Sequence, residues 1–137
     1  HEAELIRFLQ DVNSLFAPAL DTKTDLSSFS KKILTLGHVL VATVNDTIIG
    51  ACCFYTNDLI NNKAYISLLG VKSAYSGQHV ATDMISMAIE YIKLAKMKTI
   101  AIHTNNPIAK HIYEKNGFMV LSSEETDPVR YYLEMSI

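Results

Sequence analysis

The sequence predicts a mixed α/β domain of the α+β type, with a mostly antiparallel sheet, one parallel pair of strands, and helices on the sheet's faces. Two helical patterns come first, at residues 2–16 and 25–36, and three strand patterns follow them. A longer helical pattern at residues 79–96 then separates the third strand from a fourth at residues 99–104. Strands connected through a helix pack in parallel by a right-handed crossover, so the third and fourth strands are the expected parallel pair.

Length and composition fit one folded domain over residues 1–137 and limit the classes of partner. Hydrophobic residues make up 49% of the chain and charged residues 19%, which argues against disorder. The net charge is −2, and the only arginines are Arg7 and Arg130, so we expect no nucleic-acid partner. The longest apolar run, at residues 48–55, is too short to cross a bilayer, so we expect no membrane partner either.

Two adjacent cysteines, Cys52 and Cys53, indicate a reduced compartment. Neighbouring residues of a strand point to opposite faces, so these two are poorly placed to bridge each other. We expect them to be small core residues of a cytoplasmic protein. No signal peptide is visible, and a start at His1 rather than Met is typical of a trimmed chain.

The first helix has a single apolar stripe with polar residues opposite it. Its members are Leu5, Phe8, Leu9, Val12 and Phe16. Pro18 marks its end, and Asp25 is placed to cap the start of the second helix, which Gly37 closes. We expect the two helices to cover one face of the sheet, and they also have the position of a lip over a substrate site.

Three strand patterns cover residues 38–44, 47–55 and 63–71. Asn45 and Asp46 form a turn that makes the first two strands a hairpin. A polar loop at residues 57–62 precedes the third strand. Gly70 lies inside that third strand, where a glycine often marks a β-bulge or a close approach of the backbone to another group.

Residues 76–82 read as a turn that opens the N-terminus of the long helix. Such an end directs unpaired N–H groups and the positive end of the helix dipole outward, which suits a phosphate group. After the fourth strand, Asn106, Ala109 and Tyr113 lie on one face of a short helix that begins at Pro107. Gly117 ends this helix, and two last strands are expected at residues 118–123 and 129–137.

The second half of the chain carries one continuous series of spacings: Ile100-x-Ile102-x3-Asn106-x2-Ala109-x3-Tyr113-x3-Gly117-Phe118. This series resembles the L-x-V-x3-N-x2-A-x3-Y-x3-G-F pattern of the GNAT superfamily of N-acetyltransferases at every spacing. Residues 68–71 and 76–82 fall where that family places its donor-binding strand and its pyrophosphate loop. The resemblance covers residues 38–137 well, whereas the N-terminal helices match only in kind.

The resemblance implies that acetyl-CoA is the donor and lies between the two parallel strands, which splay apart in this family. The residues implied in donor binding are Leu69, Gly70, Val71, Ser76, Gly77, Gln78, His79, Val80, Ala81, Thr82, Asn106, Ala109 and Tyr113. The family's loop reads Arg or Gln, two free positions, Gly, a free position, then Gly or Ala. Only Ala81 fits strictly, because Ser76 replaces the long polar residue and His79 replaces the first glycine.

In this family an amine attacks the thioester directly, which gives three expectations for catalysis. A free strand N–H at Leu69 to Val71, at a bulge marked by Gly70, is expected to stabilise the oxyanion. Tyr113 is the candidate general acid for the thiolate, although a tyrosine there also suits core packing. His103 is the candidate base, with water or Asp58 as alternatives. The His79, His103 and His111 spacing matches no metal motif, so no metal is expected.

The sequence thus predicts an acetyl-CoA-dependent N-acetyltransferase with an unidentified amine acceptor. The alternatives are a non-catalytic acyl-CoA-binding or sensing module of the same fold, favoured by Ser76 and His79, and a domain excised from a larger enzyme. Acceptor specificity is expected in residues 16–28 and 57–63, whose Asp21, Asp25 and Asp58 suit either a cationic amine or ordinary solvation. The state is monomer or homodimer, with the last strand as a possible exposed edge.

Overall fold

A computed structural model of the chain describes residues 1–16, 18–77 and 79–137. It contains a six-stranded mixed sheet with the strand order β1-β2-β3-β4-β6-β5. The strands are β1 (His38–Val44), β2 (Thr47–Asp58), β3 (Lys63–Val71), β4 (Thr99–Thr104), β5 (Met119–Glu124) and β6 (Arg130–Ser136). The helices are α1 (Glu2–Val12), α2 (Leu26–Leu36), α3 (Val80–Leu94) and α4 (Pro107–Lys115), with short 3-10 turns η1 (Asn13–Leu15), η2 (Leu20–Thr22) and η3 (Ser73–Tyr75).

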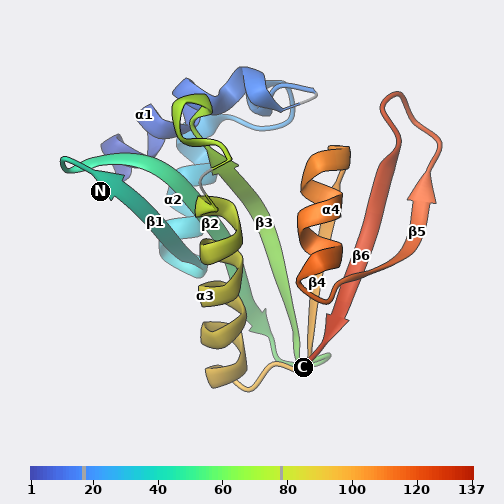
Figure 1. The fold of residues 1–137 in the computed structure, drawn as a ribbon. Helices are drawn as coiled ribbons and strands as arrows, with labels where there is room; N and C mark the ends of the chain where they lie inside the picture. Colours follow the sequence, from blue (N-terminus) through green and yellow to red (C-terminus); the bar gives the residue numbers. More distant parts are fainter. Residues whose placement is uncertain (17, 78) are drawn as a thin grey trace.

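The predicted parallel pair is confirmed, and it is paired over only part of its length. β3 and β4 are parallel from Lys63 opposite Thr99 to Ile66 opposite Ile102. Every other neighbouring pair of strands is antiparallel. Beyond Ile66 the two strands diverge, so the sheet opens into a wedge whose closed end lies near the C-terminus (Figure 1).

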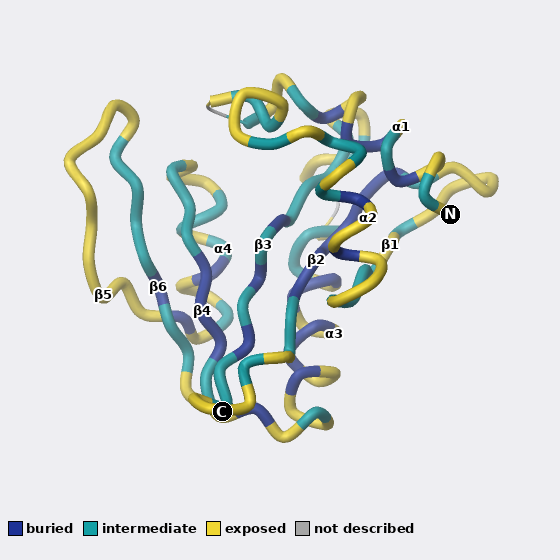
Figure 2. The backbone as a smooth tube through the Cα atoms, turned by 180° about the vertical axis from the view of Figure 1, so that it is seen from behind, coloured by how far each residue is buried: buried dark blue, intermediate teal, exposed yellow. Residues whose placement is uncertain are grey.

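Helices cover both faces of the sheet and define two cores. α1 and α2 lie on one face of the sheet, over β1–β3. On the opposite face, α3 packs on β1–β3 and α4 packs on β4 and β5 (Figures 1 and 2). The core on the α1 side is built from Leu5, Phe8, Leu9, Val12, Ile33, Ala51, Cys53 and Leu68. Each fully buried Leu, Ile or Phe side chain stabilises the fold by about 2 kcal/mol, so the amphipathic stripe seen in the sequence suffices to hold α1 in place.

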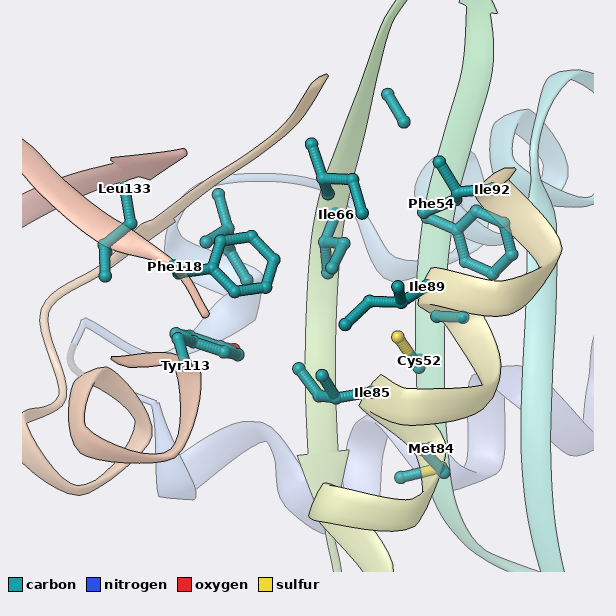
Figure 3. Packing of buried hydrophobic residues seen from close by; sticks show 14 of the residues in the cluster. Cys52, Phe54, Ile66, Met84, Ile85, Ile89, Ile92, Tyr113, Phe118 and Leu133 are labelled. Atoms are coloured by element: carbon teal, nitrogen blue, oxygen red, sulfur yellow. The ribbon is translucent and has the colours of Figure 1, made fainter. Parts of the chain in front are cut away.

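The core on the α3 side bridges the two halves of the wedge. Ile85 and Ile89 of α3 pack toward β2 and β3, while Tyr113, Phe118 and Leu133 come from the other half (Figure 3). Ile92, rather than Tyr91, is the inward residue of the last helical turn, because Ile92 is buried and Tyr91 is 45% exposed. The two halves therefore share a core although their strands separate.

The expectation of a bulge at Gly70 is wrong, because the bulge in β3 lies three residues earlier. Cys53 pairs with Leu68 and Phe54 pairs with Ile66, so Ser67 is the extra residue. One extra residue reverses the alternation of side chains. Ile66 consequently faces the α3 core, and Leu68 faces the α1 core.

Helix ends and strand edges differ from expectation at a few points. α1 stops at Val12 and continues as η1, whereas the pattern predicted a helix over residues 2–16. Asp25 caps α2 as predicted, since its carboxylate accepts from the Ser28 N–H. The last strand is not an edge: β6 lies between β4 and β5, and the edges are β1 and β5. Strand order depends on tertiary packing, which the local pattern does not encode.

The cysteines behave as predicted core residues. Cys52 and Cys53 are buried free thiols on opposite faces of β2. Burial raises the pKa of the Cys52 thiol to about 12 and also raises that of Cys53, so both stay protonated and unreactive at neutral pH. Within the described residues, no helix is long and apolar enough to cross a membrane.

Candidate active site

A cavity of about 660 Å³ opens where β3 and β4 diverge. Its lining comes from the N-terminal segment, from β3 and β4, and from the start of α4. Of the predicted site residues, those that line it are Leu69, Gly70, Val71, Ala81, His103, Asn106, Ala109 and Tyr113. The wedge therefore brings together predicted site residues that lie up to 44 positions apart in the sequence, from Leu69 to Tyr113.

The predicted phosphate loop lies at the N-terminus of α3. Gly77 has a φ of 77° and His79, the N-cap position, has a φ of 63°, so both adopt the left-handed conformation. That conformation costs a non-glycine residue about 1–2 kcal/mol. Ser76 donates its hydroxyl hydrogen to the Ser73 carbonyl at 2.9 Å. Gln78 lies outside the described residues.

The predicted loop residues divide between the cavity wall and the region beyond it. Ala81 lines the cavity, whereas Ser76, Gly77, His79, Val80 and Thr82 do not. The first N–H that bonds within α3 is that of Asp83, which donates to the His79 carbonyl at 3.0 Å. The N–H groups of Val80, Ala81 and Thr82 therefore precede the helical ladder and point out of its positive end.

The β3 backbone presents N–H groups to the open side of the wedge. The Lys72 N–H donates to the Ile49 carbonyl of β2 at 2.8 Å. Backbone groups alternate along a strand, so the N–H groups of Leu69 and Val71 point away from β2. The described part of β4 has no pairing with β3 beyond Ile66. Leu69 and Val71 therefore supply strand donors without the expected bulge at Gly70.

Aromatic rings from the N-terminal segment pack closely against Gly70, which explains why a glycine occupies this position. A Cβ built on Gly70 would lie 3.3 Å from Cζ of Phe16 and 3.8 Å from Cζ of Phe8. The two rings cover the strand where the wedge opens. The predicted close approach at Gly70 is therefore found, and the partner is an aromatic ring from the N-terminal segment.

Tyr113 projects from α4 into the interior beside the cavity (Figure 3). It is 3% exposed, and its ring packs on Phe118 with 5.8 Å between the ring centroids. Burial raises the pKa of the Tyr113 phenol well above its usual value, so the hydroxyl stays protonated. Within the described residues the hydroxyl has no hydrogen-bond partner, which leaves it available to a bound molecule.

His103 lies on the opposite face of the sheet, at the end of β4. Its Nδ1 is 2.7 Å from the Tyr65 hydroxyl, and its ring lies 4.8 Å from that of Tyr132 between centroids. Burial lowers the pKa of His103, and the charge of Arg130 lowers it further. The imidazole is therefore mainly neutral at pH 7.

The family model described as the acetyltransferase (GNAT) family matches residues 6–118, which is most of the chain. The chain belongs to the acetyltransferase (GNAT) family. A curated relative, the GCN5-related N-acetyltransferase 6, chloroplastic, from Arabidopsis thaliana, is 28% identical over 87 residues. That match covers 60% of this chain and 30% of the relative, so this GNAT chain spans about a third of the length of that relative.

Solved structures of GNAT proteins share the fold. An acetyltransferase of the GNAT family from Streptococcus pneumoniae superposes with a TM-score of 0.79 at 19% identity, covering 99% of this chain and 93% of its own. A candidate streptothricin acetyltransferase from Bacillus anthracis str. Ames, solved in complex with acetyl coenzyme A, has a TM-score of 0.65 at 27% identity, covering 74% and 63%. The mixed sheet with its splayed parallel pair is thus a GNAT fold.

Several cavity residues of this GNAT chain escaped the sequence interpretation. Tyr65, Phe29 and Arg130 line the cavity and were not among the predicted site residues. Tyr65 meets His103 only because of the register that places Tyr65 opposite Ala101. The one available signal was the expectation that residues 16–28 carry acceptor specificity. The members of that segment that line the cavity are Phe16, Leu20, Lys23, Thr24 and Leu26.

Other expected contributors have structural partners or lie elsewhere. Asn106 caps α4 by accepting from the N–H groups of Ile108 and Ala109, at 2.8 and 3.2 Å. Asp58 accepts from the Asn61 N–H at 3.1 Å, away from the cavity. Across residues 1–16, 18–77 and 79–137, no group of three or more His, Cys, Asp or Glu side chains is arranged to hold a metal ion.

Proposed function

We propose that this member of the GNAT family transfers an acetyl group from acetyl-CoA directly to a primary amine of a small molecule or a protein. The observation that carries the proposal is the wedge between β3 and β4. It joins unpaired strand N–H groups, a helix N-terminus and a buried phenol around one cavity. Acetyl-CoA supplies the activated acetyl group, and its elongated arm with a phosphate at one end fits this arrangement.

The donor side of the cavity is proposed to hold and activate the thioester. The N–H groups at the start of α3, at Val80, Ala81 and Thr82, would receive the pyrophosphate. The N–H groups of Leu69 and Val71 would align the donor along β3 and stabilise the negative charge on the carbonyl oxygen. Tyr113 would donate its hydroxyl hydrogen to the departing sulfur. Asn106 uses its side-chain oxygen as a cap, and its amide N–H₂ would bind the donor's arm.

The acceptor side is proposed to prepare the amine for attack. An ammonium group has no lone pair, so it must lose a proton first. In one tautomer of His103, Nδ1–H donates to the Tyr65 oxygen, and Nε2 then carries the lone pair that takes this proton. Tyr65 acts by orienting the ring. Both cysteines are protonated and buried, so neither thiol would form an acyl-enzyme.

A second candidate function is an acyl-CoA-binding module of the same fold that does not catalyse transfer. Ser76 and His79 favour it, because both depart from the loop pattern of the family and His79 brings a Cβ where a glycine is usual. In either case we propose one domain over residues 1–137, present as a monomer or homodimer. Reduced Cys52 and Cys53 fit a cytoplasmic location for it.

Calorimetric titration with acetyl-CoA tests the proposal. We expect saturable binding by the wild type and loss of binding in the Gly77→Asp, Ala81→Glu double variant, because two carboxylates would repel the pyrophosphate. Release of CoA with a panel of amines then separates the two functions. Binding with turnover supports the transferase, and binding without turnover for any amine supports the binding module. No binding at millimolar donor would overturn both.

A further inference from the structure

The cavity has a second wall that the donor side does not use. This wall comes from residues 9–16 and 20–29, on the face of the sheet opposite α3 and α4. Its side chains are apolar and mostly large: Leu9, Leu15, Phe16, Leu20, Leu26 and Phe29. Figure 2 shows the α1 and α2 segments that carry this wall over β1–β3, with β4, β6 and β5 uncovered beside them. An apolar group of several carbon atoms is the natural occupant of such a wall.

The charges that line the cavity are all of one sign within the described residues. Within the described part of the lining, the side chains that carry a full charge are Lys23 and Arg130, and no carboxylate joins them. Arg130 comes from β6, and its nearest carboxylate is Glu124 at 3.6 Å, which lies outside the lining. Lys23 follows η2, and the described residues give it no ion pair. The acceptor side is therefore positive around an apolar surface.

The acidic residues that could have balanced these cations have other partners or positions. Asp25 accepts from the N–H and the hydroxyl of Ser28, at 3.0 and 2.8 Å, and Asp58 accepts from Asn61. Asp21 and Asp58 do not line the cavity. A polycationic amine would thus meet two like charges and no carboxylate within the described part of the lining, which disfavours its binding.

We propose that the acceptor is a small amine with an apolar body and a carboxylate, such as an apolar amino acid. Its carboxylate would bind Arg130 and Lys23, its apolar body would pack on Phe16 and Phe29, and its amine would face the thioester near His103. This inference rests on the proposed function and narrows its acceptor. Charge-assisted contacts of Arg and Lys with a carboxylate are among the stronger hydrogen bonds of proteins.

The same two cations could instead hold a phosphate of the donor. Their position argues against that use, because Lys23 and Arg130 belong to the face opposite α3, whose N-terminus is the proposed phosphate site. Both also exert their charge on His103, the proposed base on the acceptor side. The experiment therefore has to measure donor and acceptor separately.

The first test compares acceptors that differ only in the carboxylate. CoA release is measured with L-leucine against 3-methylbutylamine, with L-phenylalanine against 2-phenylethylamine, and with spermidine as a polycation. We expect kcat/KM to be higher for each amino acid by about tenfold or more, with spermidine poorest. Equal or better use of the amines without a carboxylate, or of spermidine, would overturn the inference while leaving the transferase proposal intact.

The second test uses the Arg130→Gln and Lys23→Gln variants with Arg7→Gln and Lys31→Gln as matched controls. Arg7 and Lys31 are exposed cations on α1 and α2, away from the cavity lining. We expect the first two variants to raise KM for the amino acid by about tenfold and to leave KM for acetyl-CoA within about twofold. A rise in KM for acetyl-CoA alone would assign the cations to the donor and contradict the inference.

A binding measurement decides the matter without turnover. Calorimetry in the presence of CoA compares N-acetyl-L-leucine with N-(3-methylbutyl)acetamide, which differ by the carboxylate. Tighter binding of the carboxylate form, lost in Arg130→Gln and kept in Arg7→Gln, supports the inference. No preference overturns it. If binding shows the preference and no amine releases CoA, the transferase proposal fails and the ligand class stands.

Discussion

The Tyr65 hydroxyl lies 2.7 Å from Nδ1 of His103, and this contact joins the two strands at the point where the wedge begins to open. Tyr65 is on β3 and His103 is on β4, one position beyond Ile102, the last residue of β4 that pairs with β3. Burial raises the pKa of Tyr65 and lowers that of His103, so both groups are neutral near pH 7. The hydrogen bond at Nδ1 fixes the orientation of the neutral imidazole ring. The lone pair on Nε2, which accepts a proton when the ring acts as a base, therefore has a fixed direction.

The first prediction concerns pH. A base acts in its unprotonated form, and the lowered pKa of His103 keeps that form present down to lower pH. We therefore expect the midpoint of the acid limb of the kcat/KM profile to lie below pH 6.5, which is the ordinary pKa of histidine. The His103→Gln variant should lose this limb and fall roughly a hundredfold in kcat/KM. The part of the kcat/KM profile that reports ionisation of the amine substrate should remain in this variant and serves as an internal control.

Tyr65→Phe is the companion variant for that measurement. It removes the acceptor of the Nδ1–H bond, which stabilises the protonated ring, so the acid limb should move to still lower pH. A Tyr65 with only a packing role would leave the limb where it is. An acid limb above pH 6.5 in the wild type, or one that survives in His103→Gln, would exclude His103 as the base.

The second prediction concerns Tyr113. The variant Tyr113→Phe keeps the ring that packs on Phe118 and removes only the hydroxyl, which has no partner within the described residues. We expect the free energy of unfolding to change by less than about 1 kcal/mol and kcat to fall roughly a hundredfold. Urea denaturation and CoA-release kinetics measure the two effects. A large loss of stability with kcat intact would make Tyr113 a core residue only.

Much of the fold could be predicted because its signals are local. Each signal lies within a single element or a single hairpin. Examples are the apolar stripe of α1, the Asp25 cap of α2 and the turn at Asn45 and Asp46. The parallel pair followed from the helix between its strands. The position of β6 inside the sheet was not accessible, since it depends on which strand edges meet after folding.

The site was predictable only where its signals are local in the sequence. A close approach at Gly70 was among the expectations, but its partner is Phe16, more than 50 residues away, and no local pattern joins the two. The bulge at Ser67 gives no sequence signal because serine suits a regular strand position as well. Nothing in the sequence distinguishes Arg130 and Lys23 from other surface charges, and only the folded structure shows that both line one cavity.

The third prediction concerns His79. Its φ of 63° is a glycine conformation, and its Cβ lies where the backbone is proposed to approach a phosphate. We expect His79→Gly to leave stability within about 1 kcal/mol and to tighten acetyl-CoA binding roughly three- to tenfold in calorimetry. His79→Ala is the control, since it removes the imidazole and keeps the Cβ. Equal tightening in both variants would assign the effect to the ring.

The fourth prediction concerns stability at Gly37, the residue between α2 and β1. A Cβ there would lie 2.6 Å from Cδ1 of Ile33 and 2.8 Å from the carbonyl oxygen of Phe54. The carbonyl belongs to the β2 backbone, so it moves only if the strand moves. We expect Gly37→Ala to lower the free energy of unfolding by about 1–3 kcal/mol in urea denaturation.

Gly77→Ala is the matched comparison for Gly37→Ala. A Cβ at Gly77 meets nothing within 4 Å among the described residues, so its cost is only that of a φ of 77° in a non-glycine residue, about 1–2 kcal/mol. Gly37→Ala is therefore expected to be the more damaging of the two, although its own φ of −125° suits any residue. If Gly77→Ala lowered the free energy of unfolding more than Gly37→Ala, the β2 backbone would shift at Phe54 at little cost, and Ile33 alone would hold α2 to the sheet.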